Sequence, residues 1–287
     1  MMSRSEAARS FAVVTDSTAD IASEIALEHG ITVVPLTVTF GDESFPDGAL
    51  TQQQFFDRMN AAPVLPTTSQ PAPGAFVEAY SRALETADRV VSIHISSLLS
   101  GTVESARTAA EQFDGRVLVF DSRNLSWGLA WQVLDAAQAA SEGLTAEESL
   151  LRLEKLRERV KLIVGLDSLD NLSRGGRIGK VSAFLGSMLD LKVTLTVDAN
   201  GAFQPVARSR GEKAALKHTV EWIGKQLGDA RSAKVAVGHA LTAERAHQLA
   251  DSIRERYNVT ELVIYEAGAV VATHTGTVWG VAVMPVD

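Results

Sequence analysis

Short apolar runs alternate with segments of helical periodicity through the first half of the chain. Three runs have the length of buried strands, at residues 11–14, 90–95 and 116–122. After each run comes a segment whose apolar residues recur every three or four positions, at residues 21–30, 103–113 and 127–140. Alternating strands and helices of this kind predict a mostly parallel sheet that helices cover on both faces.

Glycine, proline and capping residues divide the remaining N-terminal segments. Residues 31–40 are typical of a second strand, in which Pro35 marks an edge or irregular position. Two glycine- and proline-rich stretches, residues 41–48 and 63–74, are predicted loops. Capping boxes begin two amphipathic helices, at Thr51 with Gln54 and at Thr145 with Glu148.

The pattern changes after the apolar run at residues 162–169. Two β-type runs flank Asn200 and Gly201, and this dipeptide is the strongest short-range signal of an antiparallel hairpin. Two amphipathic helices and three further β-type runs follow. We therefore predict an α/β protein of two domains. Residues 1–165 form an N-terminal, doubly wound, mostly parallel sheet, and residues 166–287 form a smaller C-terminal α/β domain with a mixed sheet.

The composition limits the compartment and the partners. With 287 residues, 46% of them hydrophobic, the chain is long enough for a core in each domain. A formal net charge of -8 opposes non-specific binding to nucleic acid, and the absence of cysteine excludes disulfides and thiolate metal sites. The first ten residues lack a signal-peptide core, and no apolar run approaches the roughly 20 residues that cross a bilayer. We expect a cytoplasmic protein, a monomer by default, without a nucleic-acid partner.

Hydroxyl side chains gather near the starts of predicted helices, in residues 15–17, 67–71 and 96–102. In open α/β sheets, ligands bind at the carboxyl edge of the strands, beside helix N-termini that attract anions. One serine per helix is an ordinary N-cap, but the third stretch offers three: Ser96, Ser97 and Ser100. The cluster therefore weakens the interpretation as simple caps and makes an anion site a candidate, with Ser100 either as cap or as ligand. Gly101 either shapes a tight turn or lets a ligand approach the backbone.

Two further stretches offer polar chemistry. Residues 172–180, LSRGGRIGK, hold Arg177 in a basic glycine-rich loop that suits a phosphate or an acidic partner surface, or else a solvated turn. His274 stands between two threonines in a glycine-bounded loop, whereas His94 interrupts an apolar strand as core histidines do. Because no pair of histidines has metal-ligand spacing, we predict no metal.

Several enzyme classes lack their local signatures in this chain. There is no G-x-S-x-G nucleophile elbow, and residues 172–180 do not have the spacing of a Walker phosphate-binding loop. The glycine fingerprint of dinucleotide binding is missing after residues 11–14. Hydrolysis of the elbow type and nucleotide binding are therefore not predicted.

Six stretches, in their order along the chain, resemble one family. VVTDSTADI, VVPLTVTFGDESFPDG, PTTSQPAPGAF, SIHISSLLSGTVESA, LDSLDNLSRGGRIGK and HTGTVWGV resemble the DegV family of bacterial fatty-acid-binding proteins, the acyl-carrying subunits of fatty acid kinase. The resemblance covers essentially the whole chain after residue 10. It implies a two-domain protein that holds one long-chain fatty acid in a buried tunnel and needs no cofactor.

The resemblance also implies a partner. A separate catalytic kinase subunit uses ATP to phosphorylate the carboxylate of the bound fatty acid, so this chain is expected to be a non-catalytic, lipid-binding subunit in phospholipid metabolism. A transient membrane contact is compatible with that role. Arg177 of GGRIGK is then placed to meet the kinase or to assist the transfer of the phosphoryl group.

Matched motif by motif, the family's carboxylate contacts fall on or beside seven residues: Thr68, Ser69, Ser96, Ser97, Ser100, Gly101 and His274. Candidate tunnel walls come from a helical apolar stripe, although stripes of this kind are more often ordinary core: Phe184, Leu185, Met188 and Leu189. The chain departs from the family pattern at LKVTL, where lysine-proline is usual, and at HTGTVWG, where glycine-proline-glycine is usual. Both departures leave Lys192 and His274 in place.

Two other functions stay open from the sequence. A lipid-sensing regulatory protein would bind the same ligand and signal to a different partner. A stand-alone acyl esterase would use Ser100 with His274, although the absent nucleophile elbow argues against it.

Overall fold

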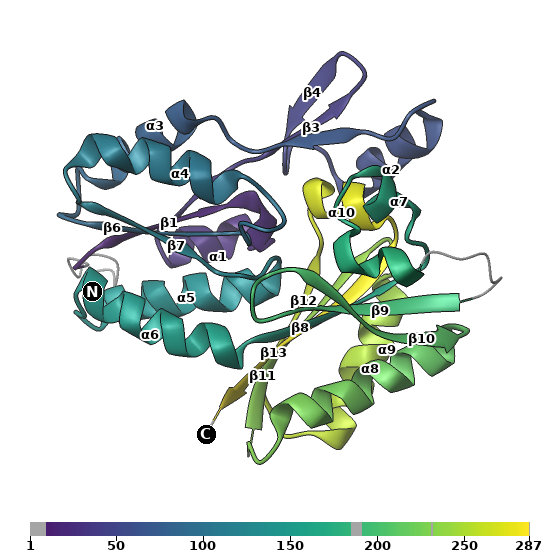
Figure 1. The fold of residues 1–287 in the computed structure, drawn as a ribbon. Coiled ribbons are helices and arrows are strands. Elements are labelled where there is room, and N and C mark those ends of the chain that lie inside the picture. The colour runs from purple at the N-terminus through teal and green to yellow at the C-terminus, as the bar shows by residue number, and fades with distance from the viewer. Residues whose placement is uncertain (1–9, 185–190, 231, 287) are drawn as a thin grey trace.

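The computed structural model describes residues 10–184, 191–230 and 232–286 (Figure 1). Its strands are β1 (Ala12–Asp16), β2 (Ile31–Val34), β3 (Thr37–Phe40), β4 (Glu43–Pro46), β5 (Thr67–Ser69), β6 (Val90–His94), β7 (Val117–Asp121), β8 (Lys161–Leu166), β9 (Leu191–Val197), β10 (Phe203–Arg210), β11 (Ser232–Ala240), β12 (Val259–Glu266) and β13 (Val278–Val286). Its α-helices are α1 (Ser23–Glu28), α2 (Gln52–Ala61), α3 (Pro73–Ala83), α4 (Thr102–Ala110), α5 (Trp127–Ser141), α6 (Ala146–Arg159), α7 (Asp170–Arg174), α8 (Glu212–Leu227), α9 (Ala243–Arg256) and α10 (Ala269–Thr275). Short 3₁₀ turns are η1 (Ser17–Ala19), η2 (Glu111–Phe113) and η3 (Gly179–Phe184).

The N-terminal half forms a four-stranded parallel sheet in the order β2-β1-β6-β7. Helices α3 and α4 lie on one face, and α1, α5 and α6 lie on the other (Figure 1). The doubly wound parallel sheet predicted for this half is confirmed. Both predicted capping boxes are present, at the starts of α2 and α6.

The second sheet has six strands in the order β10-β9-β8-β13-β11-β12. Among its pairs β11 and β12 are parallel and the others are antiparallel, so the predicted mixed sheet is confirmed. The hairpin predicted around Asn200 and Gly201 joins β9 to β10. Strand β8 begins at Lys161 and belongs wholly to this sheet, so the chain passes from one sheet to the other just before residue 161.

A third, small antiparallel sheet, in the order β4-β3-β5, was not predicted. Pro35 divides the run at residues 31–40 into β2 and β3, which belong to different sheets, because proline supplies no N–H to a continuous ladder. The two predicted loops that follow Pro35 each contain a short strand, β4 and β5. Both predictions were wrong because these strands gain their order from pairing with β3, which no local pattern reveals.

Helix α5 lies between the two large sheets. It contacts β1 and β6 on one side and β8 and β13 on the other. Eleven of its fifteen residues are buried, among them Trp127 and Trp131, as expected of a helix that is apolar all round. One hydrophobic cluster therefore runs from Ile93 in the first sheet through Leu129 to Leu162 in the second.

Candidate functional site

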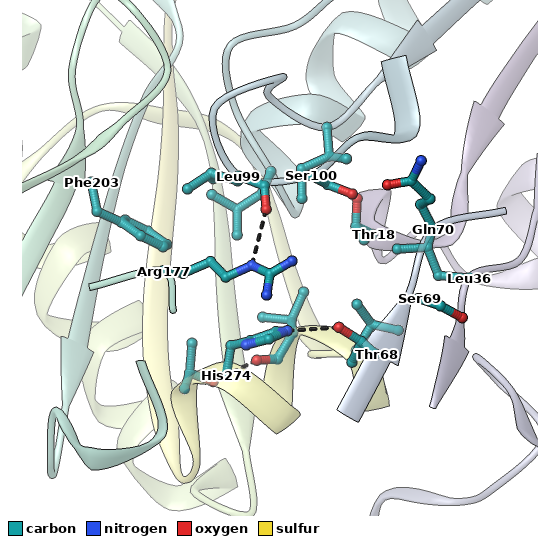
Figure 2. A pocket seen from close by; sticks show the side chains of 15 residues that line it. Thr18, Leu36, Thr68, Ser69, Gln70, Leu99, Ser100, Arg177, Phe203 and His274 are labelled. Atoms are coloured by element: carbon teal, nitrogen blue, oxygen red, sulfur yellow. Dashed lines mark hydrogen bonds between the residues drawn. The ribbon is translucent and has the colours of Figure 1, made fainter. Parts of the chain in front are cut away.

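A cavity of about 380 Å³ lies where the carboxyl edge of the parallel sheet meets the small sheet, α10 and β10. Its polar lining consists of Thr18, Thr68, Ser69, Gln70, Ser100, Arg177, His274 and Thr275. Its apolar lining consists of Leu36, Ile95, Leu99, Leu125, Phe203, Val270 and Val271. In Figure 2 Thr68, Ser69 and Gln70 lie on the side away from Phe203, with Leu36 among them. The lining therefore combines polar and apolar groups, as the binding of an amphiphile requires.

Thr68 and His274 are joined by a hydrogen bond in the cavity wall. Strand β5 pairs Thr68 with Val38 and so turns its hydroxyl toward α10, where Oγ1 lies 2.7 Å from His274 Nε2. Residues 269–275 form a helix, which corrects the loop predicted around His274. The imidazole lies against Gly175, whose missing side chain makes room for it: a Cβ there would stand 2.3 Å from Nδ1.

The imidazole of His274 is uncharged at neutral pH. Burial, together with the nearby positive charge of Arg177, lowers its pKa to about 4. Within the described part of the chain, Nδ1 has no hydrogen-bond partner. The ring therefore acts in this cavity as a neutral hydrogen-bonding group.

Arg177 supplies the positive charge of the cavity. Its Nε donates to the carbonyl of Leu99 at 3.2 Å, and one terminal nitrogen donates to the carbonyl of Gly175 at 2.6 Å. Figure 2 shows the guanidinium held between Leu99 and His274 and pointing toward the polar side chains. The cavity lining that the structure describes contains no acidic residue, so Arg177 favours an anionic ligand.

The three serines predicted near the anion site have different surroundings in the structure, and only Ser100 lines the cavity. Ser100 lines the cavity, and its Oγ lies 2.8 Å from Thr102 Oγ1. Ser96 is buried and donates to the carbonyl of Gly201 at 2.7 Å, while exposed Ser97 donates to Asp121 at 2.6 Å. Sequence alone could not separate them, because all three lie in one turn.

The backbone at Gly101 is closely approached, as one of the two predicted roles required, and the approaching group is the side chain of Gln70. A Cβ at Gly101 would stand 2.2 Å from the Oε1 of Gln70. The Gln70 amide donates to Ser105 at 2.9 Å and lines the cavity beside Ser69. Gln70 belongs to the TTSQP motif, but its place in the cavity lining depends on packing against Gly101, which the motif alone does not reveal.

A buried hydrogen-bond chain holds the carboxyl edge of the parallel sheet. Asp16 accepts hydrogen bonds from the backbone of Thr18 and Ile95, both at 3.0 Å, and lies 3.0 Å from His94 Nδ1. His94 Nε2 in turn lies 2.6 Å from Ser92 Oγ. The order resembles a catalytic triad, but the aspartate, histidine and serine are all fully buried. His94 is therefore the core histidine that was predicted, and the chain positions two residues of the cavity wall.

Two partly buried carboxyl groups hold the start of α10. Asp20 accepts a hydrogen bond from the backbone N–H of Gly268 at 2.9 Å, and Asp47 accepts one from that of Val270 at 3.3 Å. Burial raises the pKa of Asp20 to about 8 and also raises the pKa of Asp47. Both residues come from the N-terminal half, so they join the helix that carries His274 to the parallel-sheet side.

The predicted tunnel stripe falls mostly outside the described residues. Leu185, Met188 and Leu189 lie there, and Phe184 ends η3 with its side chain also outside the description. The apolar wall that is described comes instead from several separate elements. Lys192 is paired with Asp167 at 2.8 Å and is not among the cavity-lining residues.

Within residues 10–184, 191–230 and 232–286, no helix combines the length and apolarity needed to cross a bilayer. The protein is thus of the α/β class, with a parallel and a mixed sheet and a cavity whose described lining is part polar and part apolar and holds one cationic side chain. A sequence model of the DegV family, described as a family of uncharacterised proteins, matches residues 10–286. The chain belongs to the DegV family.

Relatives and solved structures of this family match nearly the whole chain. A DegV domain-containing protein of Deinococcus radiodurans is 38% identical over 280 residues, which is 97% of this chain and 99% of the relative. A DegV family protein from Thermus thermophilus, described as binding fatty acid, superposes with a TM-score of 0.92 at 35% identity, covering 96% of this chain and 99% of the other. DegV from Bacillus subtilis, described as a fatty acid binding protein, gives 0.88 at 32% identity, covering 97% and 100%.

Proposed function

We propose that this protein binds one long-chain fatty acid, with its carboxylate at the polar side of the cavity and its acyl chain along the apolar wall. The observation that carries the proposal is the cavity itself, whose described lining combines Arg177 and several hydroxyls with seven apolar side chains and contains no acidic residue. Solved relatives described as fatty acid binding proteins support it. A carboxylate that leaves water needs such donors.

The carboxylate is expected to accept hydrogen bonds from Thr68, Ser100 and Arg177, with neutral His274 orienting Thr68 through their shared hydrogen bond. Each CH₂ of the chain that leaves water contributes about 0.8 kcal/mol, so about 16 carbons contribute on the order of 12 kcal/mol before the costs of binding. The apolar wall therefore provides most of the affinity, and the polar groups fix the position of the head group.

We further propose that a separate ATP-dependent kinase subunit phosphorylates the bound fatty acid. In that reaction a carboxylate oxygen attacks the γ-phosphorus of ATP, an acyl phosphate forms and ADP leaves. Arg177, at the polar side of the cavity, would counter the charge of the incoming phosphoryl group. The missing nucleotide-binding loop in this chain agrees with a partner that supplies ATP. A lipid sensor remains the alternative, and the two differ only in the partner.

The esterase hypothesis receives no support from the geometry. His274 bonds to Thr68, and Ser100 bonds to Thr102, so the required bond between nucleophile and base is not formed. Nδ1 of His274 has no orienting carboxylate among the described residues.

Native mass spectrometry before and after organic extraction tests fatty acid binding. We expect a mass difference that matches a fatty acid, and rebinding of added palmitate or oleate to the extracted protein. The double variant Thr68→Val with Ser100→Ala should weaken rebinding at least about tenfold through loss of charge-assisted hydrogen bonds. Ser97→Ala, a matched control outside the cavity lining, should not.

Absence of both extractable lipid and rebinding would overturn the proposal. If fatty acid binds but no acyl phosphate forms with ATP and the catalytic kinase subunit, the sensor alternative replaces the kinase-subunit proposal.

A further inference from the structure

A second, much smaller cavity lies deeper than the first. It measures about 20 Å³, and four residues line both cavities: Leu125, Phe203, Val271 and Thr275. The rest of its wall is mostly apolar side chains and glycines from the mixed sheet, such as Leu162, Val164 and Val278. The hydroxyl of Thr275 already donates a hydrogen bond to the carbonyl of Val271 at 3.0 Å. This wall therefore suits a hydrocarbon chain better than a polar group. The shared residues make the small cavity the inward continuation of the apolar wall.

A separate groove of about 740 Å³ lies on the outer surface, between α1, the turn after β1 and strand β12. Among the described residues, Tyr265 alone lines both this outer groove and the small inner cavity. Tyr265 therefore stands between the small inner cavity and the outer groove.

The Tyr265 ring is held in this place from three sides. It lies over Gly238 of the neighbouring strand, where a Cβ would stand 2.3 Å from the ring. The Trp127 ring lies 5.5 Å away, centroid to centroid. The hydroxyl lies 2.7 Å from Ser126 Oγ, which itself donates to Asp20. A ring fixed by a missing Cβ, a neighbouring ring and a hydrogen bond is a rigid wall.

We propose that Tyr265 closes the inner end of the acyl-binding space and thereby sets the longest fatty acid that the protein accepts. The proposal rests on the proposed function. A chain that runs from the polar side past Phe203 and Val271 enters the small cavity and meets the Tyr265 ring. Shorter chains leave apolar wall uncovered, and longer chains must displace the ring or bend.

The test measures dissociation constants for saturated fatty acids from about 12 to about 22 carbons, for the wild-type protein and for Tyr265 variants. Each added CH₂ should tighten wild-type binding by up to about fourfold until the chain reaches Tyr265, after which the gain ends. Tyr265→Ala should move this limit by at least about two carbons, because the chain then continues toward the outer groove. Tyr265→Phe keeps the ring and should keep the wild-type limit.

A tyrosine far from the cavities provides the matched control. Tyr257 donates its hydroxyl to the carbonyl of Val220 and packs in a different hydrophobic cluster, so Tyr257→Ala should leave the chain-length limit unchanged. Tyr265→Val, which suits a strand, gives the same readout if the alanine variant does not fold.

The two proposals fail differently. A wild-type protein that binds no fatty acid of any length overturns the proposed function. Wild-type binding with an unchanged limit in folded Tyr265→Ala or Tyr265→Val overturns the role of Tyr265 alone.

Discussion

At the scale of single residues, the cavity depends on side chains whose charge is set by burial. His274 stays neutral because the interior and the Arg177 charge both disfavour its cationic form. Asp20 lies at the other end of α10, and burial raises its pKa to about 8. Neither effect could be predicted from sequence spacing, because each depends on what surrounds the group after folding.

The pKa of His274 predicts a loss of stability in acid. The unfolded chain takes up a proton near the ordinary pKa of 6.5, while the folded protein does so only near 4. Between these values the unfolded state binds more protons, so the free energy of unfolding falls as the pH is lowered from about 6.5 toward 4. The effect is at most on the order of 3 kcal/mol.

Denaturant unfolding of the wild-type protein and of His274→Gln, across this pH window, measures the effect. The variant cannot titrate at this position, so the stability difference between the two proteins should change with pH in this window and level off above about pH 7. Parallel pH profiles would contradict the prediction. Taking the difference removes the contribution of Asp20, which both proteins share.

At the scale of elements, the site depends on how short segments pack. Strand β5 presents Thr68 only because it pairs with β3, and α10 presents His274 only because α7 lies against it. Asn171 of α7 donates to the carbonyl of Thr273 at 3.1 Å and ties these two helices together. The local sequence of the β5 segment indicates a loop, so its order comes from tertiary pairing.

The contact between Gly175 and His274 predicts that a side chain at position 175 weakens fatty acid binding. In Gly175→Ala the new Cβ would stand 2.3 Å from His274 Nδ1, so the ring must move away from Thr68. We expect fatty acid binding to weaken several-fold. The free energy of unfolding should fall by about 1–3 kcal/mol from the displaced ring, with no added backbone strain, because Gly175 has ordinary helical dihedrals. Gly74→Ala is the control, since a Cβ there meets nothing within 4 Å. Palmitate titration of both variants checks this, and equal affinities would contradict it.

At the scale of the whole molecule, one core joins the two large sheets. Helix α5 packs on both, and the main hydrophobic cluster includes Ile93 and Leu129 as well as Leu162 and Leu195 of the second sheet. The cavity lies beside this shared core, with walls from both halves of the chain. Such a core is expected to couple the stability of the two halves.

This coupling predicts one cooperative thermal transition for the whole protein. Added palmitate should raise its midpoint, because a ligand that binds only the folded state stabilises it by about 2.7 kcal/mol at 100 times its dissociation constant. Differential scanning calorimetry with and without palmitate measures both effects. Two separate transitions, of which palmitate shifts one, would show that the halves unfold independently.

The parallel and mixed sheets, the two capping boxes, the core role of His94 and the family were all predicted from the sequence. These features follow from periodicity, capping and motif order, which are local along the chain. Only the tertiary structure separated Ser100 from Ser96 and Ser97 and brought Thr68 to His274. Only the fold could place Tyr265 between the inner cavity and the outer groove. Each of these contacts joins segments that are far apart in sequence or turns neighbouring side chains in different directions, and such geometry arises only when the elements pack.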